Sequence, residues 1–118
     1  MKRILIADDH TVVRRGVKQI LKDEFSSVHI GEASTVPEVY SLLSEHKWDL
    51  LILDINLSGK NGLEVLKELK QRKSTVPVLV LSMHPEEQFA LRSVRAGASG
   101  YLTKAGAPEE LIDRKSVV

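Results

Sequence analysis

Three short apolar runs constrain the fold of this 118-residue chain more than any other feature. They occupy residues 4–7, 50–53 and 76–81, and each is continuous rather than alternating with polar residues. A continuous run of this length is typical of a strand that is buried on both faces. Such strands occur in parallel sheets that helices cover on both sides. The runs therefore predict a parallel sheet at the centre of the protein.

Helical patterns lie between these runs and extend the prediction to an α/β fold. Apolar residues recur at helical spacing in four segments, and a fifth helix is expected to begin near Pro108. Residues 28–33 and 99–103 are weaker strand candidates. Strands that alternate with helices indicate right-handed βα crossovers. The helical positions are Val13, Val17, Ile20 and Leu21; Val36, Val39, Leu43 and His46; Leu63, Val65, Leu66 and Leu69; and Ala90, Leu91 and Val94.

The end of the sequence departs from the pattern of the expected fifth helix. After Leu111 and Ile112, the helix would need apolar residues near the positions that Lys115 and Ser116 occupy. We therefore expect one domain over residues 1–112, followed by a truncated last helix or tail over residues 113–118.

Composition excludes several classes of function. The chain has no cysteine, which excludes disulfide scaffolds, thiolate zinc sites and cysteine nucleophiles. Its formal net charge of +1 gives no support for nucleic-acid binding by these residues. No apolar stretch reaches the length of a membrane span or of a signal-peptide core. A cytoplasmic protein without membrane contact is therefore expected.

Polar side chains follow the expected strands at the point where each strand ends. Asp8 and Asp9 follow the first strand, and Asp54 ends the third. Ser82 ends the fourth strand and Lys104 follows the fifth. Ligands of open α/β sheets bind outside the carboxyl ends of the strands, so these side chains are expected at one rim.

This set of side chains suits phosphoryl chemistry on a carboxylate. Clustered carboxylates repel one another unless a cation neutralises them, and Mg²⁺ is a hard cation that prefers oxygen ligands. Mg²⁺ takes only one or two carboxylates, so a third could attack phosphorus as a nucleophile. The metal and Lys104 would neutralise the phosphoryl oxygens, and Ser82 could hydrogen-bond to one of them.

The chain resembles the receiver domain of bacterial two-component response regulators over residues 2–112. The resemblance rests on four motifs in the expected order: ADDH, LLILDINLSGKNG, VLVLSMH and AGASGYLTKAGAPEEL. The motifs ADDH and AGASGYLTK are most similar to those of the LuxR-type branch, whose members carry a C-terminal helix-turn-helix DNA-binding domain. The resemblance implies a flavodoxin-like, doubly wound sheet of five parallel strands in the order 2-1-3-4-5.

The resemblance also implies a metal site and a phosphoryl acceptor. Asp54 would accept a phosphoryl group from a sensor histidine kinase. Asp9 would bind Mg²⁺ directly and Asp8 would bind it through water. Asp54 and the backbone carbonyl of Asn56 would complete the ligands from the protein.

Further roles follow from the same resemblance. Lys104 would pair with the phosphoryl group, and Ser82 would move to hydrogen-bond it. Tyr101 would be an aromatic switch that turns inward once Ser82 has moved. Asn56 and His84 would tune the rate of dephosphorylation. The isomer of the bond between Lys104 and Ala105 stays open, because proline is often found at the second position and is absent here.

The implied function is a phosphorylation-dependent signalling switch rather than an enzyme. Its only chemistry would be phosphoryl transfer to its own aspartate and loss from it. Phosphorylation would change an interaction surface that controls a C-terminal DNA-binding domain in the full-length protein, and hence transcription. A homodimer could form on phosphorylation. Direct contact of these residues with nucleic acid is not expected.

Several alternatives stay open at this stage. The chain could be a phosphorylation-independent interaction module with a vestigial pocket. A metal-dependent phosphatase would want an acid two residues after Asp54, where Asn56 stands. A flavin site is disfavoured because Asp8 and Asp9 would repel phosphate. One of those two could simply cap the following helix. His10 is expected beside the acidic rim, with an ion pair to Asp9 as one option.

A basic helix face is the last feature that the sequence shows. Arg14, Lys18 and Lys22 recur at i, i+4 and i+8. The face is expected to be solvated, and a docking role is the alternative.

Overall fold

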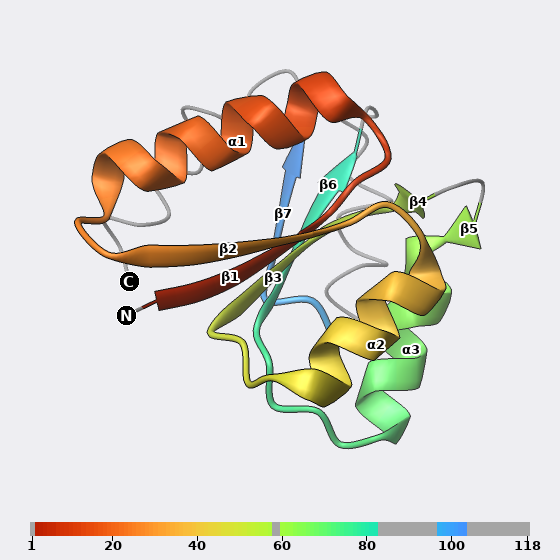
Figure 1. Ribbon diagram of the computed structural model, residues 1–118. Coiled ribbons are helices and arrows are strands. Elements are labelled where there is room, and N and C mark those ends of the chain that lie inside the picture. The colour runs from red at the N-terminus through yellow and green to blue at the C-terminus, as the bar shows by residue number, and fades with distance from the viewer. Residues whose placement is uncertain (1, 58–59, 83–96, 104–118) are drawn as a thin grey trace.

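A five-stranded parallel sheet forms the centre of the protein in the computed structural model (Figure 1). The structure describes residues 2–57, 60–82 and 97–103. The strand order is β2-β1-β3-β6-β7, and every neighbouring pair is parallel. The strands are β1 (Lys2–Ala7), β2 (Val28–Ala33), β3 (Leu50–Asp54), β6 (Val78–Ser82) and β7 (Gly100–Thr103). A separate antiparallel pair is formed by β4 (Asn56–Leu57) and β5 (Lys60–Asn61).

The predicted fold class and strand order are confirmed. When the short β4–β5 pair is set aside, the five strands of the main sheet stand in the order 2-1-3-4-5 along the chain. The strand order reverses at β1, because the chain first moves outward to β2 and then returns past β1 to β3. Such a reversal opens a crevice at the carboxyl ends of β1 and β3.

Three helices cover the two faces of the sheet in the described part of the chain. They are α1 (Thr11–Glu24), α2 (Val36–Glu45) and α3 (Gly62–Gln71). Figure 1 shows α1 on one side of the sheet and α2 and α3 on the other. The predicted helical stripes match these helices, except that α2 ends at Glu45. His46 is therefore outside the helix and serves as its C-cap.

The strands bury side chains on both faces, which explains why their sequences are continuously apolar. Ile4 and Ile6 belong to the cluster that packs under α1, together with Val17 and Leu21 of that helix. Leu5 and its neighbours on the opposite face pack against α2 and α3. Successive side chains of a strand point to opposite faces, so one strand serves both clusters. The members of the second cluster include Ala7, Ala33, Val39, Trp48, Leu51, Leu53, Leu63, Val65, Leu66 and Leu69.

Two helices begin with side-chain caps. Thr35 precedes α2, and its Oγ1 accepts a hydrogen bond of 3.3 Å from the backbone N–H of Glu38. Asn61 precedes α3, and its Oδ1 accepts one of 2.9 Å from the backbone N–H of Leu63. Each cap satisfies a backbone donor that the first turn of a helix leaves unpaired.

Some expectations lie outside the described residues. These are the fourth predicted helix with Ala90, Leu91 and Val94, the helix expected near Pro108, and the tail over residues 113–118. The division at residue 112 stays a prediction. Among the helices that the structure does describe, none is both long enough and apolar enough to cross a membrane.

We predict that Gly31→Ala lowers the free energy of unfolding by about 1–3 kcal/mol, because it overpacks the core. A Cβ at Gly31 would lie 3.1 Å from Cζ3 and 3.2 Å from Cζ2 of Trp48, and it would overlap Cη2. The indole cannot easily move away, since its Nε1 donates a 2.9 Å hydrogen bond to the carbonyl of Leu42. Urea unfolding followed by circular dichroism measures the change.

The matched control is Gly16→Ala. Gly16 lies inside α1, and a Cβ there would meet nothing within 4 Å. This variant should gain about 0.5–1 kcal/mol, because alanine restricts the unfolded chain more than glycine does. Equal effects of the two substitutions would contradict the packing assigned to Trp48.

Candidate metal centre

Three carboxylates and one imidazole meet at the carboxyl ends of β1 and β3. The residues are Asp8, Asp9, His10 and Asp54, and one ligand atom from each lies within 4.8 Å of all the others. The strand register brings them together, because Ala7 pairs with Leu53 in the two parallel strands. Asp8 follows Ala7 and Asp54 follows Leu53, so these two acids lie side by side at the rim.

The cluster has a buried floor and an exposed mouth. The side chains of Asp8 and Asp54 are 0% and 2% exposed, whereas those of Asp9 and His10 are 34% and 56% exposed. Carboxylates are costly to bury unless a cation or hydrogen bonds compensate them. A site with two buried acids and an accessible side is therefore suited to a small dication that enters from solvent.

The imidazole of His10 contacts every acid of the cluster. Its Nδ1 lies 3.0 Å from Oδ1 of Asp8, 3.1 Å from Oδ1 of Asp9 and 3.7 Å from Oδ2 of Asp54. The backbone N–H of His10 donates a further bond of 2.8 Å to Oδ1 of Asp8. The sequence predicted His10 beside the rim and allowed a pair with Asp9, but it did not predict the contacts with the two buried acids.

The tip of β1 is held by the backbone of β2 and by an arginine from α1. The N–H of Asp8 donates to the carbonyl of Ala33 at 3.0 Å. The guanidinium of Arg14 donates from Nη1 to the carbonyl of Asp8, and its Nε donates to Oε1 of Glu32 at 3.3 Å. Lys18 reaches Oε2 of the same glutamate, also at 3.3 Å. These contacts join the acidic turn to the first turn of α1 and to the edge strand.

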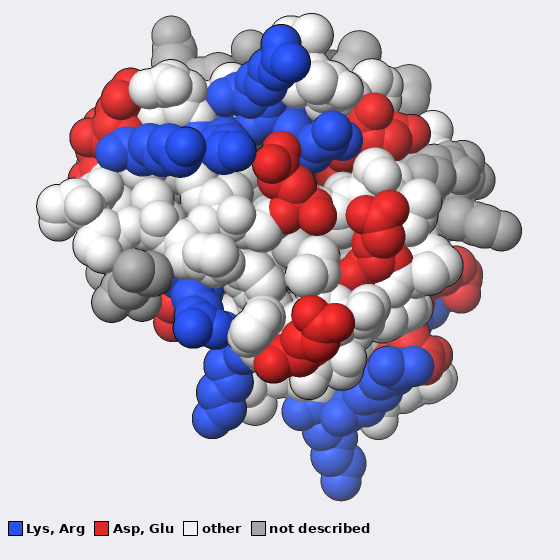
Figure 2. All heavy atoms as spheres, in the orientation of Figure 1, with Lys and Arg blue, Asp and Glu red and all other residues white. Residues whose placement is uncertain are grey.

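The basic face of α1 is only partly solvated: Lys22 is exposed as expected, whereas Arg14 and Lys18 pair with Glu32. Figure 2 shows basic side chains gathered along α1 with acidic side chains directly below them. Arg14 is only 19% exposed, because it lies against the sheet edge. The role of Arg14 was missed, although an arginine in the helix turn that follows an acidic pair was a usable signal.

The turn after Asp54 is shaped by short-range backbone contacts. Oδ1 of Asp54 accepts a 3.1 Å hydrogen bond from the backbone N–H of Asn56. The N–H of Gly62 donates to the carbonyl of Ile55. A Cβ at Gly62 would lie 2.8 Å from the carbonyl oxygen of Asp54 and 2.8 Å from Cα of Ile55. Only glycine allows α3 to begin this close to the backbone of Asp54 and Ile55.

The remaining predicted site residues are described in part or not at all. Ser82 ends β6 opposite Thr103, and Tyr101 lies in β7 opposite Val80, so the two residues lie in neighbouring strands. Their side chains are outside the described part of the structure, as are His84 and Lys104 entirely. Asn56 lies in β4, directly after the acidic floor. The roles assigned to these residues stay predictions.

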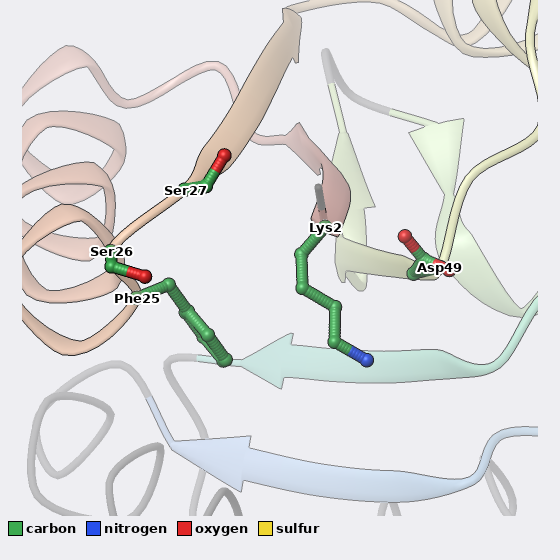
Figure 3. Close-up of a pocket in the computed structure, with 5 residues that line it drawn as sticks. All are labelled: Lys2, Phe25, Ser26, Ser27 and Asp49. Carbon is green, nitrogen blue, oxygen red and sulfur yellow. The ribbon is translucent and has the colours of Figure 1, made fainter.

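Two surface hollows lie away from the acidic cluster. One hollow, of about 490 Å³, lies at the amino ends of the strands, and its lining includes Lys2, Phe25 and Asp49 (Figure 3). The other lies between α2 and α3, where the guanidinium of Arg72 stacks 4.7 Å from the ring centroid of Tyr40. Burial raises the pKa of Tyr40, with a smaller contribution from Glu68. Neither hollow gathers several carboxylates, so the candidate site is the cluster at the opposite rim.

Known proteins share this architecture. A model of the response regulator receiver domain matches residues 4–115. The chain belongs to this family. Receiver domains typically bind Mg²⁺ at an acidic pocket, and the oxygen donors of Asp8, Asp9 and Asp54 fit a hard dication of that kind.

Similar receiver domains occur in regulators of transcription. The chain is 31% identical over 112 residues to the response regulator UvrY of Escherichia coli, covering 95% of this chain and 51% of that protein. It is 39% identical over 118 residues to the transcriptional regulatory protein DegU of Brevibacillus brevis, covering 98% and 49%. The chain thus spans about half the length of these curated relatives.

A solved structure shows the same fold. A LuxR-family two-component response regulator from Aurantimonas superposes with a TM-score of 0.87 at 33% sequence identity. The alignment covers 98% of this chain and 82% of that one. Together with the relatives, it places the chain among receiver domains of the LuxR type, as the motifs predicted.

We predict that Arg14→Ala lowers the free energy of unfolding by about 1–2 kcal/mol, because it removes hydrogen bonds to the Asp8 carbonyl and to Glu32. Arg15→Ala is the matched control, since Arg15 is exposed on the same helix and should change stability by less than about 0.5 kcal/mol. Urea unfolding of both variants measures the difference. A loss of equal size in the two variants would show that Arg14 does not hold the strand tip.

Proposed function

We propose that this chain is a phosphorylation-dependent switch in which Asp54 accepts a phosphoryl group from a sensor histidine kinase. The observation that supports the proposal most is the convergence of buried Asp54 with Asp8 and Asp9 at the mouth of a receiver fold. A nucleophilic carboxylate beside a dication site is the arrangement that phosphoryl transfer to aspartate requires.

The residues of the chain have distinct tasks in the proposed transfer. Asp8 and Asp9 hold the cation, and Mg²⁺, when bound, neutralises charge on the phosphoryl oxygens. An oxygen of Asp54 attacks phosphorus and forms an acyl phosphate while the kinase histidine leaves. The N–H of Asn56 holds Oδ1 of Asp54 in place during the attack. Lys104 pairs with the transferred group, and the carbonyl of Asn56 joins the metal ligands.

The proposed chemistry is confined to the chain's own aspartate. Hydrolysis of the acyl phosphate returns the switch to its resting state, and Asn56 and His84 tune that rate. Turnover of external phosphate esters is not expected, because Asn56 cannot act as a general acid where a phosphatase of this kind needs one.

The phosphorylated state is proposed to act on an output domain. Ser82 and Tyr101 lie in the neighbouring strands β6 and β7, and their rearrangement would carry the signal from Asp54 to the surface. One relative is named a transcriptional regulatory protein and one similar structure is a LuxR-family regulator, which supports a C-terminal DNA-binding output domain and control of transcription. Because its proposed partners are a histidine kinase and DNA, we expect this switch to act in the cytoplasm.

Acetyl phosphate with Mg²⁺ should label the parent chain with one phosphoryl group, and Asp54→Asn should abolish the label. The physical reason is that an amide is too poor a nucleophile to form the acyl phosphate. Intact-protein mass spectrometry measures incorporation. Asp23→Asn, which changes an exposed acid of α1, should label like the parent.

Two results would contradict this proposal. Equal labelling of Asp54→Asn and the parent would show that another residue accepts the phosphoryl group. An unlabelled parent that still binds partners would favour an interaction module with a vestigial pocket.

We predict that beryllofluoride with Mg²⁺ increases the molar mass of the parent chain toward that of a dimer. Beryllofluoride mimics the phosphoryl group on Asp54, and the altered surface would then pair with a second copy. Light scattering after size-exclusion chromatography measures the mass, with Asp54→Asn as the control that should stay unchanged. A parent mass that does not respond would show that these residues do not dimerise on activation.

A further inference from the structure

The acidic pocket contains a nitrogen donor besides its oxygen donors. Nδ1 of His10 lies within 3.1 Å of carboxylate oxygens of Asp8 and Asp9 and 3.7 Å from an oxygen of Asp54. Mg²⁺ binds nitrogen donors weakly, since it favours carboxylate, carbonyl and water ligands. Zn²⁺ and Co²⁺ bind imidazole together with carboxylates readily.

The separations between these donor atoms suit a small dication. Ligand atoms about 2.0–2.2 Å from a tetrahedral metal stand roughly 3.3–3.6 Å apart. The three distances from Nδ1 to the carboxylate oxygens run from 3.0 to 3.7 Å and bracket that range. Small side-chain shifts would bring one metal within reach of the imidazole and of at least two carboxylates.

The position of His10 is fixed by its neighbours along the chain. It occupies the N-cap position of α1, and its carbonyl accepts a 3.1 Å hydrogen bond from the N–H of Arg14. Its own N–H is bonded to Oδ1 of Asp8. The backbone is thus held at both ends of the residue, and the contacts of Nδ1 with Asp8 and Asp9 place the ring at the acidic cluster.

We propose that His10 is a metal ligand of this pocket and makes it selective for transition-metal dications, with Zn²⁺ and Co²⁺ as probes, over Mg²⁺. The proposal rests on the cation site of the proposed function but not on phosphoryl transfer. Asp8, Asp9 and Asp54 supply oxygen donors to both classes of metal, and His10 supplies the nitrogen that only the transition metals use well.

Calorimetric titration with Zn²⁺, Co²⁺ and Mg²⁺ tests the selectivity. His10→Asn should weaken Zn²⁺ and Co²⁺ binding by at least about tenfold, with less than about threefold change for Mg²⁺. His46→Asn removes an exposed histidine outside the cluster and should leave all three affinities at parent values. Asp9→Ala should weaken all three metals, because it removes a shared oxygen donor.

The visible spectrum of bound Co²⁺ gives a readout that a merely structural role of His10 would not move. Loss of a nitrogen ligand should shift and weaken the Co²⁺ bands in His10→Asn, and His10→Gln serves as a second variant if the first unfolds. Circular dichroism confirms that each variant folds.

Three results would overturn the proposal. Equal weakening of all metals would show that His10 only shapes the pocket. Tighter binding of all metals by His10→Asn would show that the imidazole competes with the cation. Unchanged Zn²⁺ affinity and an unchanged Co²⁺ spectrum would show that His10 is not a metal ligand. Labelling by acetyl phosphate with Mg²⁺ is measured separately, so failure of Asp54 as an acceptor would leave the metal titrations interpretable.

Discussion

The in-register pairing of β1 with β3 is the constraint on which the rest of the structure depends. Ala7 stands opposite Leu53, so the chain places Asp8 and Asp54 next to each other as the two strands leave the sheet. A shift of one residue would send every apolar side chain of a strand to the wrong face and separate the acids. The two buried clusters that fix this register therefore also bring the carboxylates together. The pairing of β1 with β3 therefore determines both the packing of the core and the position of the acids at the rim.

Proximity of two buried carboxylates has a cost that local contacts partly offset. The backbone N–H groups of His10 and Asn56 each donate to one of the two acids. The imidazole of His10 contacts the same acids, and the guanidinium of Arg14 adds a positive charge and a donor at this turn. Hydrogen bonds to ionised groups are stronger than neutral ones. The turn is thereby held in a shape that can accept a cation without rebuilding the backbone.

Much of the fold was predictable because the strands are buried on both faces. The continuous runs that became β1, β3 and β6 left little ambiguity, and the helical stripe of Val13, Val17, Ile20 and Leu21 coincides with α1. Acids at strand ends could be assigned to one rim for the same reason. The β4–β5 pair was not predicted, because two-residue strands carry no periodicity. The contacts of Arg14 with Glu32 were also missed, since they join segments that only the folded sheet edge brings together.

The position of Trp48 has a practical consequence. It is the single tryptophan of the chain, it is buried against α2 and β2, and it precedes β3, whereas Asp54 ends that strand. Five strand residues span roughly 17 Å, so the indole and the acidic rim lie at opposite ends of the sheet. Its emission therefore reports the integrity of the core and should be insensitive to what occupies the pocket. Intrinsic fluorescence and a metal-sensitive absorbance band could then be recorded on one sample as two independent signals, one for folding and one for occupancy.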